Sequence, residues 1–179
     1  VAKFYPRSFN MGIHRKIFEN IGGMNKLRHG QDMDFSQRIY DAGYKVGLIA
    51  DAFVYHKRRT SLSKFYRQIF NWGVARINLA QQHPSMLKAV HLLPAMVVTG
   101  IGLLIILTIL FPLLAAPLWM LTAIGYMVIV LWAFFESLTK YKSLKTALLS
   151  PVTLNIQVFA YGFGLLKALW QVKVLKREE

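Results

Sequence analysis

One uncharged run decides the fold: LLPAMVVTGIGLLIILTILFPLLAAPLWMLTAIGYMVIVLWAFF, from Leu92 to Phe135. A helix crosses the hydrocarbon core of a bilayer with about 20 residues, so this run is long enough for two spans. Pro112 and Pro117 interrupt it near the middle, and a proline inside a helix removes a hydrogen bond. We therefore predict a transmembrane hairpin with its turn at these prolines and spans near 92–112 and 117–136.

The flanks of this hairpin are basic. Lys140, Lys142 and Lys145 follow the second span, and residues 1–89 carry +10 of the net charge of +14. The positive-inside rule therefore predicts that both flanks lie in the cytoplasm. Residues 146–166 form a third uncharged stretch, for which a true span and an interfacial or re-entrant segment both stay open.

Composition limits the class of protein. Hydrophobic residues make up 55% of the 179, which is too apolar for an ordinary soluble domain and leaves too little polar surface to enclose the hairpin. The basic excess comes without zinc-ligand spacing or an RNA-binding motif, so we expect no nucleic acid partner. Anionic lipid and sugar diphosphates fit it better. The absence of cysteine excludes disulfides and thiolate metal sites.

The N-terminal half has the pattern of a small α/β unit. Helices are predicted over 14–21, ended by two glycines, and over 32–42, ended by Gly43. Two β-prone runs follow at 44–49 and 52–56. We therefore predict the C-terminal portion of an α/β domain, followed by an α-helical membrane region with two or three transmembrane helices.

A further helix is predicted between these two parts. Residues 62–82 place apolar side chains at helical spacing, with Lys64, Arg67 and Arg76 among them. Such a helix can rest in the headgroup plane or pack against the rest of the domain. The sequence leaves both alternatives open.

Asp32 and Asp34 are the carboxylates of chemical interest. Residues two apart do not share a helix face, so one of the two is expected to be structural. Asp32 stands at the predicted helix start, where the macrodipole favours the ionised form that a general base requires. Its alternative role is a plain N-cap.

A basic loop follows the second β-prone run. His56, Lys57, Arg58 and Arg59 stand beyond a predicted strand end, where open α/β sheets bind their ligands. Arginine forks suit diphosphate oxygens, and the same patch also suits anionic lipid. The His56 imidazole is a candidate metal ligand, with a plain hydrogen bond as the alternative.

Several short motifs occur in order between Phe9 and Ile77. They are Phe9-Asn10-Met11-Gly12, Ile17-Phe18-Glu19-Asn20-Ile21-Gly22-Gly23, Gly30-Gln31-Asp32-Met33-Asp34-Phe35, Val54-Tyr55-His56-Lys57-Arg58-Arg59-Thr60 and Gln68-Ile69-Phe70-Asn71-Trp72. This set resembles family 2 glycosyltransferases, which are inverting enzymes with a nucleotide-sugar-binding α/β fold. The third motif is similar to the family's G-E-D-x-D-L element, with Gln31 in place of Glu. The last is similar to Q-x-x-R-W of processive members, with Asn71 in place of Arg.

The resemblance implies roles for individual residues. Asp32 would be the catalytic base that deprotonates the acceptor hydroxyl. Substrate-binding roles are implied for Gln31, Asp34, Lys57, Arg58, Arg59, Gln68 and Trp72. A divalent metal, Mg or Mn, would be bound mainly by an upstream D-x-D element, with His56 as the candidate ligand here. The departure at Asn71 favours non-processive transfer to a lipid-linked or surface-glycan acceptor.

These observations predict four parts. Residues 1–61 would be the C-terminal part of the catalytic domain and 62–89 an amphipathic interfacial helix with its linker. Residues 90–136 would be the hairpin, and 137–179 a basic loop, third hydrophobic segment and basic tail. The chain begins at Val1 without a signal-peptide pattern, so we expect a fragment that is inactive alone.

The predicted function is a membrane-anchored inverting glycosyltransferase, multi-pass in the cell (inner) membrane, with its catalytic portion facing the cytoplasm. Its partners would be a nucleotide-sugar donor, a lipid-linked or glycan acceptor and membrane lipids. The alternative is a non-enzymatic basic membrane protein that binds anionic lipid or a partner. That alternative needs no Asp32, so the effect of an Asp32→Asn substitution distinguishes the two.

Overall fold

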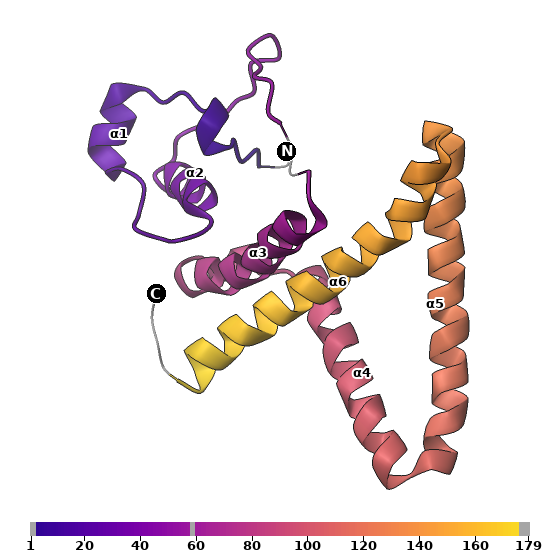
Figure 1. The fold of residues 1–179 in the computed structure, drawn as a ribbon. Helices are drawn as coiled ribbons and strands as arrows, with labels where there is room; N and C mark the ends of the chain where they lie inside the picture. Colours follow the sequence, from indigo (N-terminus) through magenta and orange to yellow (C-terminus); the bar gives the residue numbers. More distant parts are fainter. Residues whose placement is uncertain (1–2, 58–59, 176–179) are drawn as a thin grey trace.

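The computed structural model describes residues 3–57 and 60–175, and this part of the chain is built from α-helices joined by turns and irregular segments (Figure 1). The helices are α1 (Arg15–Ile21), α2 (Gln31–Asp41), α3 (Leu62–Gln82), α4 (Leu93–Leu110), α5 (Pro112–Tyr141) and α6 (Leu144–Lys173). Short 3-10 turns lie at η1 (Ser8–Asn10), η2 (Pro84–Met86) and η3 (Ala89–Leu92). Helices α4 and α5 form a V-shaped hairpin, and α6 crosses from the end of α5 to α3 (Figure 1).

The predicted α/β unit is wrong, because residues 3–57 and 60–175 contain no β-strand. The runs 44–49 and 52–56 are irregular, and Ile49 and Tyr55 are 74% and 95% exposed. β-propensity expresses how well a side chain fits a paired, half-buried surface, not an intrinsic preference of the backbone. An extended run becomes a strand only when a neighbour pairs with its N–H and C=O groups, and the described part of the chain supplies no such neighbour.

The three predicted helices of the N-terminal half are confirmed. The first ends at Gly22, and a turn at Gly43 follows the second, both with positive φ as expected. Helix α3 covers the predicted residues 62–82. Gly30, with φ of 86°, is the N-cap of α2, so the alternative role of Asp32 as an N-cap is wrong.

Gly30 also brings the start of α2 against α3. A Cβ added at Gly30 would come within 2.9 Å of Leu79 Cδ1. The left-handed backbone and the absence of a side chain are therefore both needed at this position. This contact places the first turn of α2 directly beside α3.

The hairpin turn lies at Phe111, before both prolines, so the predicted turn between them is wrong. Pro112 is the first residue of α5. The backbone N–H at this position makes no hydrogen bond within a helix, so its absence in proline costs nothing. Pro117 lies inside α5, which continues to Tyr141. A proline near the start of a long apolar helix is thus accommodated without ending it.

Residues 146–166 lie within α6, which is continuous through Pro151 and therefore is not a re-entrant loop. Among the described residues, three helices are long and apolar enough to cross a membrane: Ala89–Leu110, Pro112–Tyr141 and Leu144–Lys173. Helix α6 contacts the first turn of α4. A Cβ added to Gly162 of α6 would lie 2.6 Å from the carbonyl oxygen of Pro94. It therefore crosses the open end of the hairpin obliquely (Figure 1).

The backbones of α3 and α6 touch where the two helices cross. A Cβ added to Gly164 would collide with the carbonyl oxygen of Phe70, and one added to Gly73 would collide with that of Tyr161. Small residues permit this close approach, as they do between membrane helices. The crossing depends on a glycine from each helix.

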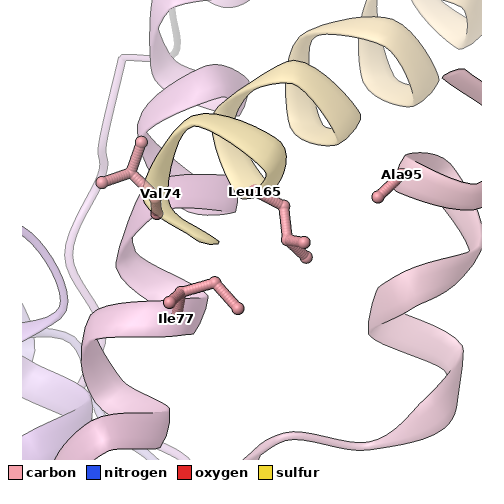
Figure 2. Packing of buried hydrophobic residues seen from close by; sticks show 5 residues of the cluster. Val74, Ile77, Ala95 and Leu165 are labelled. Atoms are coloured by element: carbon pink, nitrogen blue, oxygen red, sulfur yellow. The ribbon is translucent and has the colours of Figure 1, made fainter. Parts of the chain in front are cut away.

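A buried apolar cluster surrounds this crossing. Its members come from α3, α4 and α6, and they are Val74, Ile77, Ala95, Leu165 and Ala168. Leu165 lies between the α3 side chains and Ala95 of α4 (Figure 2). The apolar face of α3 therefore packs against other helices of the chain, which is the packing alternative of the two considered for this helix.

Asp34 joins the N-terminal helices to the end of α3. Its carboxylate is fully buried; Oδ2 accepts from Arg38 Nε at 3.1 Å and from Asn25 Nδ2 at 3.0 Å. Its Oδ1 lies 2.9 Å from Nε2 of His83, which follows α3. Arg38 also donates to the carbonyl oxygens of Ile21 and Gly23. One ionic network thus fixes α1, α2 and α3 relative to one another.

Gly164→Ala should lower the free energy of unfolding by about 1–3 kcal/mol, because the new Cβ forces α6 away from the Phe70 carbonyl. Thermal or denaturant unfolding of the detergent-solubilised protein measures this. Gly102→Ala in α4 is the matched control, since a Cβ there meets nothing within 4 Å. Equal losses in both variants would contradict the close crossing.

Asp34→Asn should destabilise the protein by about 3–5 kcal/mol, because it leaves the charge of Arg38 without its buried partner. The same unfolding experiment measures the change. Asp41→Asn is the control: Asp41 is 55% exposed and 3.7 Å from His83 Nδ1, so its loss should change stability by less than about 1 kcal/mol. A silent Asp34→Asn would show that the network does not hold the helices together.

Candidate functional site

A cavity of about 470 Å³ lies where the start of α2 faces α3 and α6. Its walls are Arg7, the segment 28–33, one face of α3 that includes Trp72 and Arg76, and Tyr161 of α6. Two glycines allow the helices that form these walls to approach one another. Gly30 lets the start of α2 pack against α3, and Gly73 lets α3 pack against α6. The cavity therefore combines residues that lie far apart in the sequence.

Asp32 lies in this cavity, in the first turn of α2. Its side chain is 17% exposed, and Oδ1 accepts from the Met33 backbone N–H at 3.0 Å. Its Oδ2 lies 3.4 Å from Nη1 of Arg7, a side chain that is 55% exposed. Asp32 is thus held in place by its helix, while its other oxygen lies beside a solvent-exposed guanidinium group.

The cavity is strongly cationic. Arg7, Arg28 and Arg76 line it together with His29, and among the described lining residues Asp32 is the one carboxylate. Guanidinium groups bind phosphate and carboxylate oxygens through paired N–H donors. The arrangement can therefore hold an anionic group beside a single carboxylate that is able to accept a proton.

A second cavity, of about 450 Å³, adjoins the first and shares His29 and Trp72 with it. Gln68 and Asn71 line it, beside Lys64 and Arg67. Gln31 lies in the first cavity next to Asp32, and its Nε2 donates to the Asn25 carbonyl oxygen at 3.0 Å. The structure thus brings Gln31 and Asp32 close to the segment from Gln68 to Trp72.

The other predicted site residues lie elsewhere. Asp34 points into the interior, with both carboxylate oxygens engaged in the network described above. Lys57 is exposed and lines neither cavity, and Arg58 and Arg59 lie outside the described residues. His56 stacks on the ring of Phe9, with centroids 4.6 Å apart.

The described residues provide no ligand set for the expected Mg or Mn ion. Within 3–57 and 60–175, no group of three or more His, Cys, Asp or Glu side chains lies close enough together to hold a metal. His56 has no such companions there.

The predicted site residues did not include Arg76, Arg28, Arg7 or Tyr161. For Arg76 a signal was present, because Gln68, Trp72 and Arg76 recur every four residues and so share one face of a helix. Arg7 and Tyr161 reach the cavity only through the packing of segments distant in sequence, which no local pattern reports.

Comparison with known proteins identifies the family. The model of glycosyl transferase family 21 matches residues 7–178, whereas no curated protein and no solved structure matches the chain. The broader prediction of a glycosyltransferase is confirmed, but the specific resemblance to family 2 is not supported, since family 21 is a different family. Because the match covers all six described helices and both cavities, the chain belongs to glycosyl transferase family 21.

Proposed function

We propose that this chain acts in the transfer of a sugar from a nucleotide-sugar donor to an acceptor hydroxyl at the membrane surface. The observation that carries the proposal is the cavity in which Asp32 lies among Arg7, Arg28 and Arg76. A carboxylate can accept the proton of an attacking hydroxyl, and guanidinium groups suit the oxygens of a leaving diphosphate. The cavity thus supplies both groups that such a transfer needs.

In the proposed reaction, Asp32 accepts the proton of the acceptor hydroxyl as its oxygen forms a bond to the anomeric carbon. The bond from that carbon to the diphosphate breaks on the opposite face, and the nucleoside diphosphate leaves with the electron pair. The configuration at the anomeric carbon is therefore inverted. Arg7 does not block this role, because an exposed ion pair at 3.4 Å is weak enough for an acceptor to displace it.

The remaining residues are assigned by their places around the cavities. Trp72 lies between the two cavities, and Gln31 and Gln68 line one each, so we assign these three to substrate binding. Asp34 would serve the site by fixing α2 instead of touching substrate. Lys57 and its basic neighbours keep the proposed role of contacting the donor diphosphate or anionic lipid. A divalent metal would support the leaving diphosphate, but the described residues do not form its site.

The acceptor is proposed to be lipid-linked or a surface glycan, because α6, one of the three apolar helices, supplies part of the cavity wall through Tyr161. The basic residues of α3 and of the α5–α6 turn favour a cytoplasmic position for the cavity at the cell (inner) membrane. The reaction would then take place at the headgroup level.

Asp32→Asn should lower the rate of sugar transfer by about 10²–10⁴-fold, since Asn cannot accept the proton. The protein is expressed from its complete coding sequence, and its membranes are incubated with a panel of nucleotide sugars and divalent metal. Asp51→Asn is the matched control, because this exposed loop residue undergoes the same change of charge and lines neither cavity. Expression of all variants is compared on the same membranes.

Consumption of one donor by wild type and Asp51→Asn, but not by Asp32→Asn, supports the base assignment. If Asp32→Asn transfers sugar as fast as wild type, Asp32 is not the base. If wild type consumes no donor at all, the non-enzymatic alternative of a basic lipid-binding protein takes precedence.

A further inference from the structure

Two buried side-chain polar atoms in the described part of the chain have no hydrogen-bond partner, and both belong to residues that line the Asp32 cavity. They are Nε of Arg76 and the hydroxyl oxygen of Tyr161. Nearly all buried polar groups in native proteins are paired, and an unpaired one is destabilising. Their occurrence in one cavity, on two different helices, indicates a ligand that supplies the missing acceptor.

Arg76 also lacks a charge partner. Its Nη1 donates to the carbonyl oxygen of Met86 at 3.5 Å, a long bond to a neutral group. None of the ion pairs found among residues 3–57 and 60–175 involves Arg76. A partly buried guanidinium that forms no ion pair is best satisfied by an anion.

The crossing of α3 and α6 holds the two groups in place. Gly73 packs against the Tyr161 backbone, and Arg76 lies one helical turn beyond Gly73. Their side chains therefore extend from rigid, packed helices and not from loops. Donors that are fixed in this way lose little conformational freedom on binding, which favours affinity.

The charges around the cavity favour an anionic ligand over a neutral sugar. Among the described lining residues, Arg7, Arg28 and Arg76 stand against a single carboxylate, Asp32, and Arg7 already lies 3.4 Å from it. The Nε–H of Arg76 and the O–H of Tyr161 are two donors, from residues of one cavity wall, that an oxyanion can accept from. Phosphoryl oxygens accept such charge-assisted hydrogen bonds readily.

We propose that Arg76 and Tyr161 form a subsite that holds a phosphoryl oxygen of a substrate beside Asp32. This inference rests on the proposed function and names the chemistry that the cavity recognises. The phosphoryl group has two sources, the diphosphate of the donor or the headgroup of an anionic phospholipid at the α6 wall. Arg76 and Tyr161 bind and orient this group and take no part in proton transfer.

The test measures binding to the protein expressed from its complete coding sequence and placed in phosphatidylcholine nanodiscs. In one arm inorganic pyrophosphate is titrated, and in the other phosphatidylglycerol is added and its retention is counted by native mass spectrometry. Arg76→Gln should weaken binding about 10- to 100-fold, and Tyr161→Phe about 2- to 10-fold. Tyr161→Phe keeps the aromatic ring and removes only the hydroxyl, so it is expected to fold. It therefore still tests the subsite if the Arg76→Gln variant does not fold.

Lys145→Gln is the charge control, since Lys145 is exposed at the opposite end of α6, about 24 Å from Tyr161 along the helix. If the Arg76→Gln and Tyr161→Phe variants bind pyrophosphate more weakly than wild type, the subsite is assigned to the donor diphosphate. If they retain less phosphatidylglycerol, it is assigned to a lipid headgroup. Unchanged binding of both probes, or an equal loss in Lys145→Gln, overturns the subsite. Because neither arm requires sugar transfer, this result is independent of the outcome for Asp32→Asn.

Discussion

At the crossing of α3 and α6 two backbones meet with no side chain between them, because Gly73 and Gly164 occupy the contact. This approach buries the apolar face of α3 and turns its opposite face, with Trp72 and Arg76, toward the start of α2. The same contact places Tyr161 in the wall of the Asp32 cavity. The site and the apolar helices are therefore one packed unit, and a change at the crossing alters both stability and site geometry.

The two neighbouring aspartates divide their tasks because α2 turns them to different sides. Asp34 faces the interior and joins α2 to His83 directly and, through Arg38, to the end of α1. Asp32 faces the cavity, with only an exposed arginine near its outer oxygen. The buried ionic network of Asp34 fixes the helix that carries Asp32, so Asp32 makes one bond to its own helix, from the Met33 N–H to Oδ1, and leaves Oδ2 on the side of Arg7.

The sequence predicted those features that depend on local rules. Helix α3 and the glycine stops at Gly22 and Gly43 follow from apolar periodicity and positive φ, and the separation of Asp32 from Asp34 follows from helix geometry. Residues 44–49 and 52–56 were wrongly predicted as strands, because the pairing of a strand depends on tertiary structure. Likewise the turn was misplaced, since Pro112 begins a helix as readily as a proline ends one. Tyr161 and Arg7 were missed because only long-range packing brings them to Asp32.

The hairpin has arms of unequal length, which links the site to bilayer thickness. Helix α4 is about 27 Å long, near the thickness of the hydrocarbon core, whereas α5 is about 45 Å long. The surplus of α5 carries Glu136 and Lys140 beyond the level of α4 and sets the height from which α6 descends to α3. Where α5 is longer than the hydrocarbon core is thick, the mismatch would be relieved by tilting of α5. A change in lipid chain length would therefore change the tilt of α5 and displace α6, which carries Tyr161.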